Sequence, residues 1–378
     1  MSAFSAADRQ FMAIALQQAE QGRYTTDPNP CVGAVLVKNQ TIIGTGYHQR
    51  AGEPHAERHA LSAAGKQAQG STLYVTLEPC CHQGRTPPCT QALIAAGVQD
   101  VVVAMQDPNP QVAGQGIATL RAAGITTRVG LLETEARALN PGFIQRMKLG
   151  KPLIRLKLAM SLDGRTATAN GESQWITSSA ARADVQRLRA ASSAILTGIG
   201  TVLTDDPALT VRPDELNDIP TDHHRQPLRI VLDSQARMPT QAQMLRLPGQ
   251  TLIVTGPIIP TERRQALQTA GADIISLPLS DNCLSLPHLI PHLTERELNT
   301  ILIECGPTLA GSVLQAGIVD ELIVYLAPCL LGDQARGLVT LPGLQQLAQR
   351  LSLQLVETQP IGPDLRLTLH PQPATPTS

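Results

Sequence analysis

Apolar and polar residues alternate along the first third of the chain in short blocks that predict strands and helices. Strands are expected at residues 32–37, 41–46, 72–77, 100–105 and 126–129, where β-branched residues gather. Helices are expected at residues 55–65, 88–96 and 113–123, each ending at or just before a glycine. This β-β-α-β-α-β-α-β order predicts an α/β layered domain around a mixed sheet.

A second alternation of the same kind begins after residue 150. Residues 131–150 predict a helical connector, and Gly150-Lys151-Pro152 is the expected domain boundary. Further strands are expected at residues 153–160, 194–198, 228–232, 251–255, 301–304 and 321–326. The polar, proline-rich stretch 212–227 predicts a surface loop. We therefore expect a domain at 1–150, a second at 151–370 and a disordered tail at 371–378.

Composition narrows the possible functions. The chain of 378 residues is 42% hydrophobic and carries 30 basic against 31 acidic residues, with a net charge of −1. Aromatic residues make up 2% of the chain. Without excess positive charge or aromatic stacking platforms, nucleic-acid binding is disfavoured. We also expect no membrane span, no signal peptide and no disulfide framework, and hence a cytoplasmic protein.

Cysteine and histidine are concentrated in one short region of the first domain. Three of the seven cysteines and four of the nine histidines lie between His48 and Cys89. His55-Ala56-Glu57 opens a predicted helix, and Pro79-Cys80 follows a predicted strand. Zinc nucleobase deaminases carry H-x-E and P-C-x-x-C, with the glutamate acting as acid and base. We predict one Zn²⁺ held by His55, Cys80 and Cys89, with Glu57 as the catalytic proton carrier.

Two alternatives to this zinc prediction are a different ligand and a purely structural role for the metal. The second cysteine follows Cys80 by nine residues instead of three, so the intervening loop must bulge outward. His59 shares a helix face with His55 and is an alternative ligand, whereas Cys81 cannot easily share the direction of Cys80. A purely structural zinc would need four protein ligands, and three ligands plus a carboxylate favour an open catalytic position.

Two glycine turns in the second domain are candidate phosphate sites. Gly306-Pro307 follows a predicted strand and starts a helix, where free N–H groups attract phosphate. Gly198-Ile199-Gly200 also follows a strand but lacks the third glycine of the dinucleotide fingerprint. Each turn is either a phosphate site or an ordinary tight turn. Because this third glycine is missing, an ordinary Rossmann domain is disfavoured.

The motifs of the first domain resemble a known family. The run PNPCVG at 28–33, HAE at 55–57 and EPC-x8-C at 78–89 resemble the pyrimidine deaminase of riboflavin biosynthesis. The resemblance implies a cytidine-deaminase-like fold and deamination of 2,5-diamino-6-ribosylamino-4(3H)-pyrimidinone 5′-phosphate. It also implies that Asn29, His82 and Arg85 contact the base or the ribose phosphate.

The second domain resembles the reductase that is fused to this deaminase. The matching runs are SLDGRTA at 161–167, GESQWITS at 171–178, TVLTDDPALTVR at 201–212 and ECGPTLAG at 304–311. The resemblance implies a dihydrofolate-reductase-like fold and NADPH-dependent reduction of the ribosyl side chain to ribityl. The implied NADP contacts are Ala159, Trp175, Thr201, Asp205, Ser234, Gly306, Pro307, Thr308, Leu309, Ala310, Gly311 and Ser312. The implied substrate contacts are Ser173, Arg189, Leu209, Arg212 and Glu304, with Lys157 as a further candidate.

The expected partner is a small pyrimidine ribotide, with no nucleic acid and no membrane involved. The resemblance further implies a homodimer or homotetramer. The alternative is a nucleoside or tRNA deaminase with an unrelated nucleotide-binding domain appended. That alternative predicts a basic groove or a dispensable second domain, and the charge and aromatic content disfavour a nucleic-acid substrate.

Overall fold

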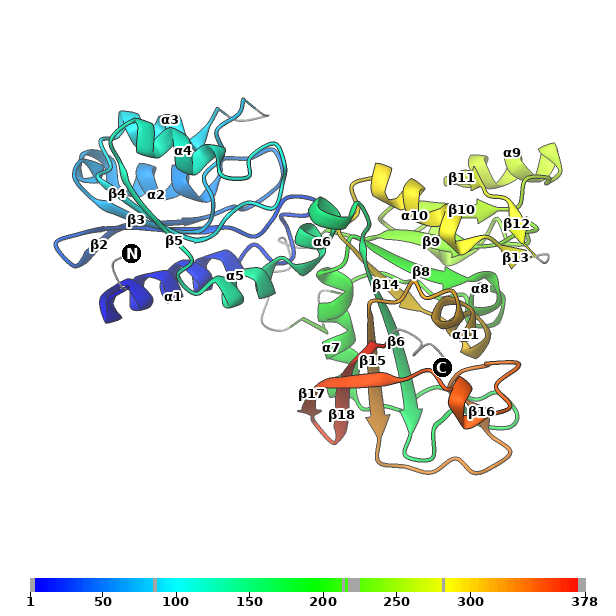
Figure 1. Ribbon diagram of the computed structural model, residues 1–378. Helices are drawn as coiled ribbons and strands as arrows, with labels where there is room; N and C mark the ends of the chain where they lie inside the picture. Colours follow the sequence, from blue (N-terminus) through cyan, green and yellow to red (C-terminus); the bar gives the residue numbers. More distant parts are fainter. Residues whose placement is uncertain (1–3, 84–86, 213–214, 217–224, 281–282, 373–378) are drawn as a thin grey trace. The chain divides into compact units, whose positions relative to one another are not determined.

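The chain divides into two compact units, residues 1–150 and 151–378, which are described separately below. The structure is a computed structural model that describes residues 4–83, 87–212, 215–216, 225–280 and 283–372 (Figure 1). In the described part of the chain, no helix is long and apolar enough to cross a membrane.

The first unit is a five-stranded sheet with helices on both faces (Figure 1). Its sheet order is β2-β1-β3-β4-β5; β1 pairs antiparallel with β2 and β3, while β3, β4 and β5 are parallel. Its elements are α1 (Ala6–Glu20), β1 (Gly33–Lys38), β2 (Thr41–Tyr47), α2 (Ala56–Ala64), the 3₁₀ helix η1 (Gly65–Ala68), β3 (Thr72–Leu77), α3 (Cys89–Ala95), β4 (Asp100–Met105), α4 (Gln115–Ala122), β5 (Thr126–Val129), α5 (Glu133–Leu139) and α6 (Pro141–Leu149).

Small residues let helix α2 lie close against the hairpin β1–β2. Ala56, Ala60 and Ala64 are buried on the helix face that meets the sheet. A Cβ at Gly44 would lie 2.3 Å from the carbonyl oxygen of Ala60, and one at Gly46 would lie 2.6 Å from that of Ala56. Any side chain at these strand positions would push the helix outward. The close packing fixes the start of α2, where the predicted metal and proton-transfer residues lie.

The second unit is built on a nine-stranded sheet in the order β11-β10-β9-β8-β14-β6-β15-β18-β17. The strands from β11 to β15 in this order run parallel, and β18 and β17 add an antiparallel edge. Its elements are β6 (Leu153–Ser161), β7 (Arg165–Ala167), α7 (Ser179–Ala190), β8 (Ala194–Gly198), α8 (Ile199–Asp205), β9 (Leu228–Leu232), η3 (Gln243–Leu245), β10 (Thr251–Thr255), α9 (Thr261–Thr269), β11 (Ala272–Ser276), β12 (Leu279–Ser280), β13 (Cys283–Leu284), α10 (Leu286–Glu295), β14 (Thr300–Glu304), α11 (Pro307–Gln315), β15 (Glu321–Ala327), β16 (Arg336–Gly337), η4 (Leu347–Gln349), β17 (Leu353–Ile361) and β18 (Asp364–Pro371).

The central strands of this unit read as nearly continuous apolar runs because helices cover both faces of the sheet. One core contains Leu156, Leu196 and Ile303, and the other contains Ile195, Val231 and Ile253. Since parallel strands end at the same edge of a sheet, the residues that follow β8, β9 and β14 gather along one edge.

The structure differs from the sequence prediction in several parts. The connector 131–150 is two helices that break at Asn140, where the backbone leaves the helical region before Pro141. The hairpin β17–β18 was not predicted, although Leu365, Leu367 and Leu369 alternate with polar residues. Pro371 ends a strand and Gln372 N–H bonds the Ser352 carbonyl, so the predicted disordered tail starts too early; residues 373–378 lie outside the described residues.

The predicted surface loop 212–227 falls largely outside the described residues. In its described part, Leu216 and Pro227 are buried, so the loop is not confined to the surface.

Candidate functional site

The structure brings His55, Cys80 and Cys89 together in the first unit. Their donor atoms all lie within 4.8 Å of one another. His55 Nδ1 lies 3.5 Å from Cys80 Sγ and 3.4 Å from Cys89 Sγ. Tetrahedral zinc with ordinary bond lengths would hold nitrogen and sulfur about 3.6 Å apart. The donor set and its spacing therefore fit a zinc ion with a fourth position left for water.

Each of these three side chains is placed by the end of a regular element. His55 is the residue that precedes the first turn of α2, and Cys89 is the first residue of α3. Cys80 lies three residues after β3 ends, and its Sγ accepts a hydrogen bond from Cys89 N–H at 3.3 Å. The Cys89 thiol beside it and the His55 imidazole lower the pKa of Cys80, which favours one thiolate here.

Glu78 holds the cysteine loop to the rest of the unit. Its buried carboxylate accepts hydrogen bonds from the N–H groups of Asp107 at 3.1 Å, Gly114 at 2.9 Å and Ile117 at 3.1 Å. A Cβ at Gly116 would lie 2.1 Å from the Pro79 carbonyl oxygen, so glycine is required for this close approach. The start of α4 thus fixes the backbone just before Cys80.

Glu57 lies in the first turn of α2, two residues after His55, and is buried. Burial raises the pKa of its carboxyl, while the charge of His55 opposes that rise. A carboxyl whose pKa is raised holds a proton more readily, as a group that accepts and returns a proton in one reaction cycle must. This is the environment expected of an acid/base residue.

Asn29 is oriented by His48, a residue that the sequence analysis did not select. His48 Nδ1 lies 3.2 Å from the Pro54 carbonyl oxygen, which can only accept, so this nitrogen carries the proton. His48 Nε2 then accepts from Asn29 Nδ2 at 3.0 Å, leaving Asn29 Oδ1 for another group. Burial lowers the pKa of His48 to about 4, so it stays neutral near pH 7. Its ring also packs edge-on against His55, with centroids 5.2 Å apart.

The remaining predicted residues of this site fall outside the donor cluster. His82 is exposed, and Arg85 lies outside the described residues. Among the described residues, the cluster of possible metal donors contains neither His59 nor Cys81. Burial raises the pKa of Cys81, which keeps it a thiol. The rival ligand His59 therefore has no support from the geometry.

In the second unit, Arg189, Glu304 and Lys157 form a charged cluster at the carboxyl edge of the sheet. Arg189 Nε lies 2.6 Å and its Nη2 3.0 Å from the two oxygens of Glu304, a two-pronged pair. Lys157 Nζ lies 4.0 Å from Glu304, and only 11% to 19% of these side chains is exposed. Burial lowers the pKa of Lys157. Burial alone would raise the pKa of Glu304, but Arg189 keeps it lowered.

The two predicted glycine turns lie against each other. A Cβ at Gly198 would contact the side chain of Leu309 in α11 at 3.2 Å, whereas a Cβ at Gly306 would meet no atom within 4 Å. Gly306 is the residue before the first turn of α11, whose free N–H groups suit an anion. Gly311 is needed for packing, because a Cβ there would lie 1.8 Å from the Thr340 carbonyl oxygen.

The other predicted reductase residues occupy the elements around this edge. Thr201 and Asp205 are on α8, and Ser234 follows β9 after the buried Asp233. Ala159 is half-buried on β6, and Leu209 is buried with a positive φ of 45°. Ser173 and Arg212 are exposed. Trp175 is 65% exposed beneath the Arg182 guanidinium, 4.6 Å from its ring centroid, so a core role for this tryptophan is excluded.

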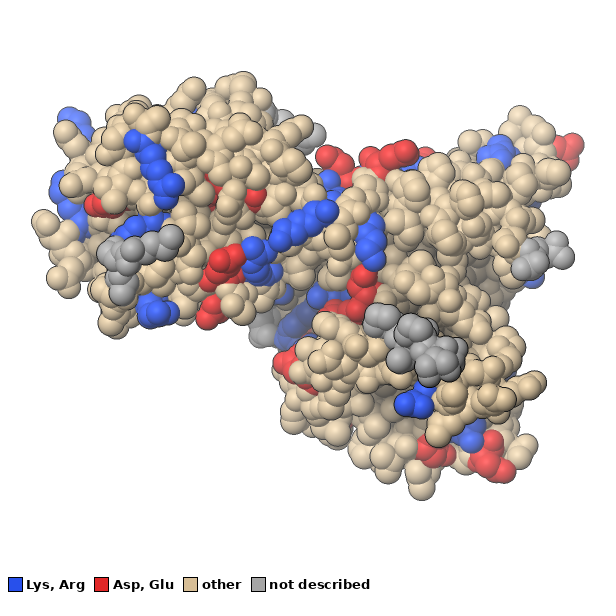
Figure 2. Space-filling model, viewed as in Figure 1, with Lys and Arg blue, Asp and Glu red and all other residues tan. Residues whose placement is uncertain are grey.

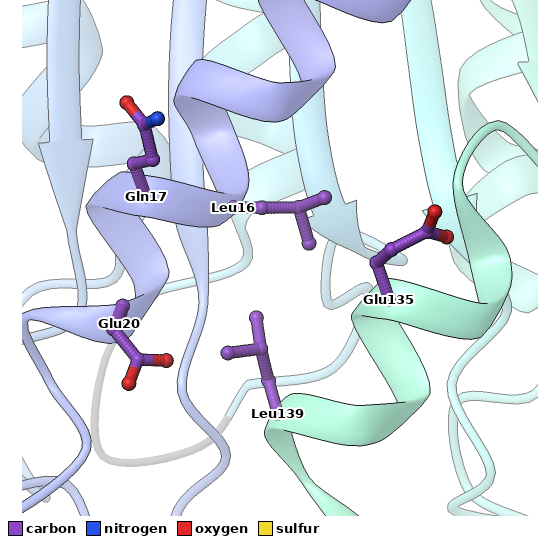
Figure 3. Close-up of a pocket in the computed structure, with 5 residues that line it drawn as sticks. All are labelled: Leu16, Gln17, Glu20, Glu135 and Leu139. Carbon is purple, nitrogen blue, oxygen red and sulfur yellow. The ribbon is translucent and has the colours of Figure 1, made fainter.

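A pocket of about 340 Å³ between α1 and α5 contains none of the predicted site residues (Figure 3). It is lined by Leu16, Gln17, Glu20, Glu135 and Leu139, and the two leucines face each other across it. Helices α1 and α5 cover the opposite face of the sheet from α2 and α3. The pocket is therefore separate from the donor cluster.

The charges on the visible face of each unit are of both signs and scattered (Figure 2). This agrees with the near-neutral composition.

The fold, the donor cluster and a sequence match define the class of the first unit. Residues 5–105 match the cytidine and deoxycytidylate deaminase zinc-binding region, and residues 152–367 match the RibD C-terminal domain. The first unit is thus a zinc-binding type of deaminase.

The chain is similar to several proteins over nearly its whole length. It is 54% identical to riboflavin biosynthesis protein RibD of Escherichia coli, over 96% of this chain and 99% of that one. Among solved structures, Acinetobacter baumannii RibD is 45% identical with a TM-score of 0.89, covering 97% and 99% of the two chains. A Thermotoga maritima diaminohydroxyphosphoribosylaminopyrimidine deaminase/5-amino-6-(5-phosphoribosylamino)uracil reductase is 32% identical with a TM-score of 0.82, at the same coverage.

The chain belongs to the RibD family. It is a bifunctional enzyme of riboflavin biosynthesis, with a deaminase unit followed by a reductase unit. The predicted resemblance and fold class are confirmed, with a cytidine-deaminase-like unit and a dihydrofolate-reductase-like unit. The alternative of an unrelated appended domain is wrong, since the family match extends through the second unit.

Proposed function

We propose that the first unit deaminates 2,5-diamino-6-ribosylamino-4(3H)-pyrimidinone 5′-phosphate and that the second reduces the ribosyl side chain of the product. The similarity to RibD proteins along both units carries this proposal, because the two activities would act on consecutive forms of one ribotide. The domain limits proposed are 1–150 and 151–370, in line with the two compact units.

In the deaminase unit, His55, Cys80 and Cys89 would hold one zinc ion, which supplies a water whose pKa falls to about 7. Glu57 would take a proton from the attacking water and return it to the departing amino group, so that ammonia leaves and a carbonyl remains. Its buried position and raised pKa support both transfers. Asn29, whose Nδ2 is bonded to His48, would contact the base or the ribose phosphate of the ribotide, and so would His82 and Arg85.

In the reductase unit, NADPH would lie across the glycine turns at the carboxyl edge of the sheet. The start of α11, from Gly306 to Ser312, would bind phosphate, and Thr201, Asp205, Ala159 and Trp175 would contact the rest of the cofactor. Ser234 and the exposed Arg237 would receive a 2′-phosphate, which favours NADPH over NADH.

The ribotide would bind beside the charged cluster, touching Ser173, Arg189, Leu209, Arg212 and Glu304. The protein's part in hydride transfer is to orient the two reactants and to balance charge. Lys157, whose pKa is lowered by burial, would bond the ribose and is a candidate proton donor.

We further propose a cytoplasmic homodimer or homotetramer that takes neither nucleic acid nor membrane as a partner. Support for self-association comes from β17, the outermost strand of its sheet, which exposes Leu353, Leu355 and Val356. An exposed apolar edge strand is a template for pairing with another copy. Light scattering on the full chain tests this, and a monomer at micromolar concentration would contradict it.

The decisive experiment follows the diaminopyrimidine ribotide with the zinc-loaded full chain, with and without NADPH. Without NADPH we expect ammonia and the ribosylaminouracil phosphate; with NADPH we expect the ribityl product and one NADPH oxidised per ammonia released. NADPH oxidation without ammonia would overturn the proposed order of steps. Equal KM values for NADH and NADPH would overturn the 2′-phosphate site at Ser234 and Arg237.

A further inference from the structure

Each unit contains a loop whose backbone is held by a carboxamide side chain from outside the loop. In the first unit, Asn140 Oδ1 accepts from Cys31 N–H at 2.7 Å, and Asn140 Nδ2 donates to the Cys31 carbonyl at 2.9 Å. In the second, Gln226 Oε1 accepts from Val211 N–H at 2.9 Å, and Gln226 Nε2 donates to the Val211 carbonyl at 3.0 Å. Both amides imitate the pairing of a neighbouring strand.

The residues that are held are buried but belong to neither a helix nor a strand. Cys31 is 7% exposed and Val211 is 2% exposed. Buried backbone N–H and C=O groups need partners, and a loop has no strand ladder to supply them. One amide side chain satisfies the donor and the acceptor of one residue together. It therefore fixes where that residue lies and how its peptide groups are turned.

In the first unit the held loop carries a proposed substrate residue. Asn29 lies two residues before Cys31, and Arg146 Nη2 adds a bond to the Pro28 carbonyl at 3.4 Å. Asn140 itself lies at the break between α5 and α6, beyond residues 5–105 that match the deaminase region. The two helices after β5 thus brace the loop from outside the matched deaminase region.

In the second unit the held loop lies between two proposed substrate contacts, Leu209 and Arg212. Four backbone groups of residues 210–212 are bonded by side chains. Arg189 Nη1 donates to the Thr210 carbonyl at 3.1 Å, Gln226 pairs with both groups of Val211, and the buried Gln186 accepts from Arg212 N–H at 3.0 Å. Because Arg189 also pairs with Glu304, the loop is tied to the charged cluster.

We propose that Asn140 and Gln226 are positioning residues, one for the deaminase site and one for the reductase site. Each acts through the backbone of a substrate-binding loop, to which its amide is hydrogen-bonded. The proposal rests on the proposed function, because that function identifies the two loops as substrate-binding. Loss of either amide should weaken binding of the ribotide at its own site more than it slows the chemical step.

The two activities of the full-length chain provide the test, since each site serves as the folding control for the other. We expect Asn140→Ala to raise KM for deamination about tenfold, the scale of two lost hydrogen bonds, with kcat within about threefold. Zinc content and KM for reduction of the deaminated ribotide should not change. Gln226→Ala should raise KM for reduction of the deaminated ribotide about tenfold and leave KM for deamination unchanged. Gln315→Ala is the matched control, because its amide donates to the carbonyl of Pro342 at 3.3 Å and to neither of the two loops.

Isosteric variants keep the test decisive if an alanine variant does not fold. Asn140→Asp and Gln226→Glu retain an acceptor for the N–H but lose the donor to the carbonyl, and the same site-specific rise in KM is expected. If the wild-type chain has both activities but a variant shows unchanged KM values, or equal rises in KM at both sites, the positioning roles alone are overturned. A wild-type chain with neither activity would overturn the proposed function and the positioning roles with it.

Discussion

The two units present their candidate chemistry in different ways. In the deaminase unit, the donor cluster and Glu57 come from two short segments. One is the start of α2, and the other runs from Cys80, just after β3, to Cys89 at the start of α3. In the reductase unit, the charged cluster joins β6, α7 and β14, so its members Lys157, Arg189 and Glu304 are distant in sequence. Metal donors that come from two neighbouring segments form a compact sequence motif. Charged residues that come from three separate elements of a sheet and a helix form no such motif.

The strongest test of this contrast removes the proton carrier of the compact site. Glu57→Gln should lower kcat for deamination by about 10²–10⁴-fold, because the amide cannot transfer the proton. Zinc content, measured by metal analysis, should remain that of the wild type, since Glu57 is not among the three clustered donors. Reduction of the deaminated ribotide should also be unchanged.

A matched control for this change is Glu53→Gln, a half-buried carboxylate in the loop just before α2. Deamination at the normal rate in the Glu57 variant, or an equal loss in both variants, would show that Glu57 is not the proton carrier.

A second test addresses the dispersed site. Glu304→Gln should lower kcat/KM for reduction by about 10²-fold, since it leaves two largely buried cations, Arg189 and Lys157, without their counter-charge. Deamination by the same protein should be unaffected, which would separate a site effect from misfolding. Both rates are measured on the full-length chain.

The control for this variant is Glu321→Gln. Glu321, the first residue of β15, pairs with Arg155, which lies two residues before Lys157 on β6. If Glu321→Gln slows reduction as much as Glu304→Gln does, the effect belongs to the sheet and not to the site.

The smallest effect concerns a type of buried network that occurs in both units. In the first, Tyr74 O–H donates to Asp8 at 2.7 Å and Arg128 donates to both oxygens of Asp8 at 3.0 Å. In the second, Tyr325 O–H donates to Asp184 at 2.6 Å and Arg366 donates to it at 3.0 Å. Each network ties a helix to a central strand and to a strand nearer the edge.

Asp8→Asn should lower the free energy of unfolding of the deaminase unit by about 2 kcal/mol at pH 7. The Arg128 guanidinium holds the pKa of Asp8 well below its ordinary value. The stabilisation is therefore complete above the unfolded pKa of about 4 and is lost as pH falls below it. The urea concentration at which deamination disappears, compared with that for reduction, measures the effect. A difference in this urea concentration between wild type and variant that stays constant down to pH 3 would contradict the prediction.

Several features were readable from sequence because they depend on local rules. Glycines that follow predicted helical segments indicated the helix ends, and runs of β-branched residues indicated the central strands. His55, Cys80 and Cys89 were chosen because two thiolates and an imidazole beside H-x-E are a donor set suited to zinc. His48, Asn140 and Gln226 were missed, since a histidine or an amide in a loop carries no local signal of its partner. Their partners, Asn29, Cys31 and Val211, are remote in sequence or bonded through the backbone.

The sequence by itself determined the two α/β units, the family and the metal-ligand candidates, because hydrophobic period, turn residues and ligand type are properties of neighbouring positions. Only the tertiary structure decided that His59 and Cys81 lie outside the donor cluster and that Trp175 is exposed. It also decided which groups hold the two substrate loops. The physical reason is that buried polar groups must find partners wherever the fold supplies them, and that supply depends on which distant elements packing brings together.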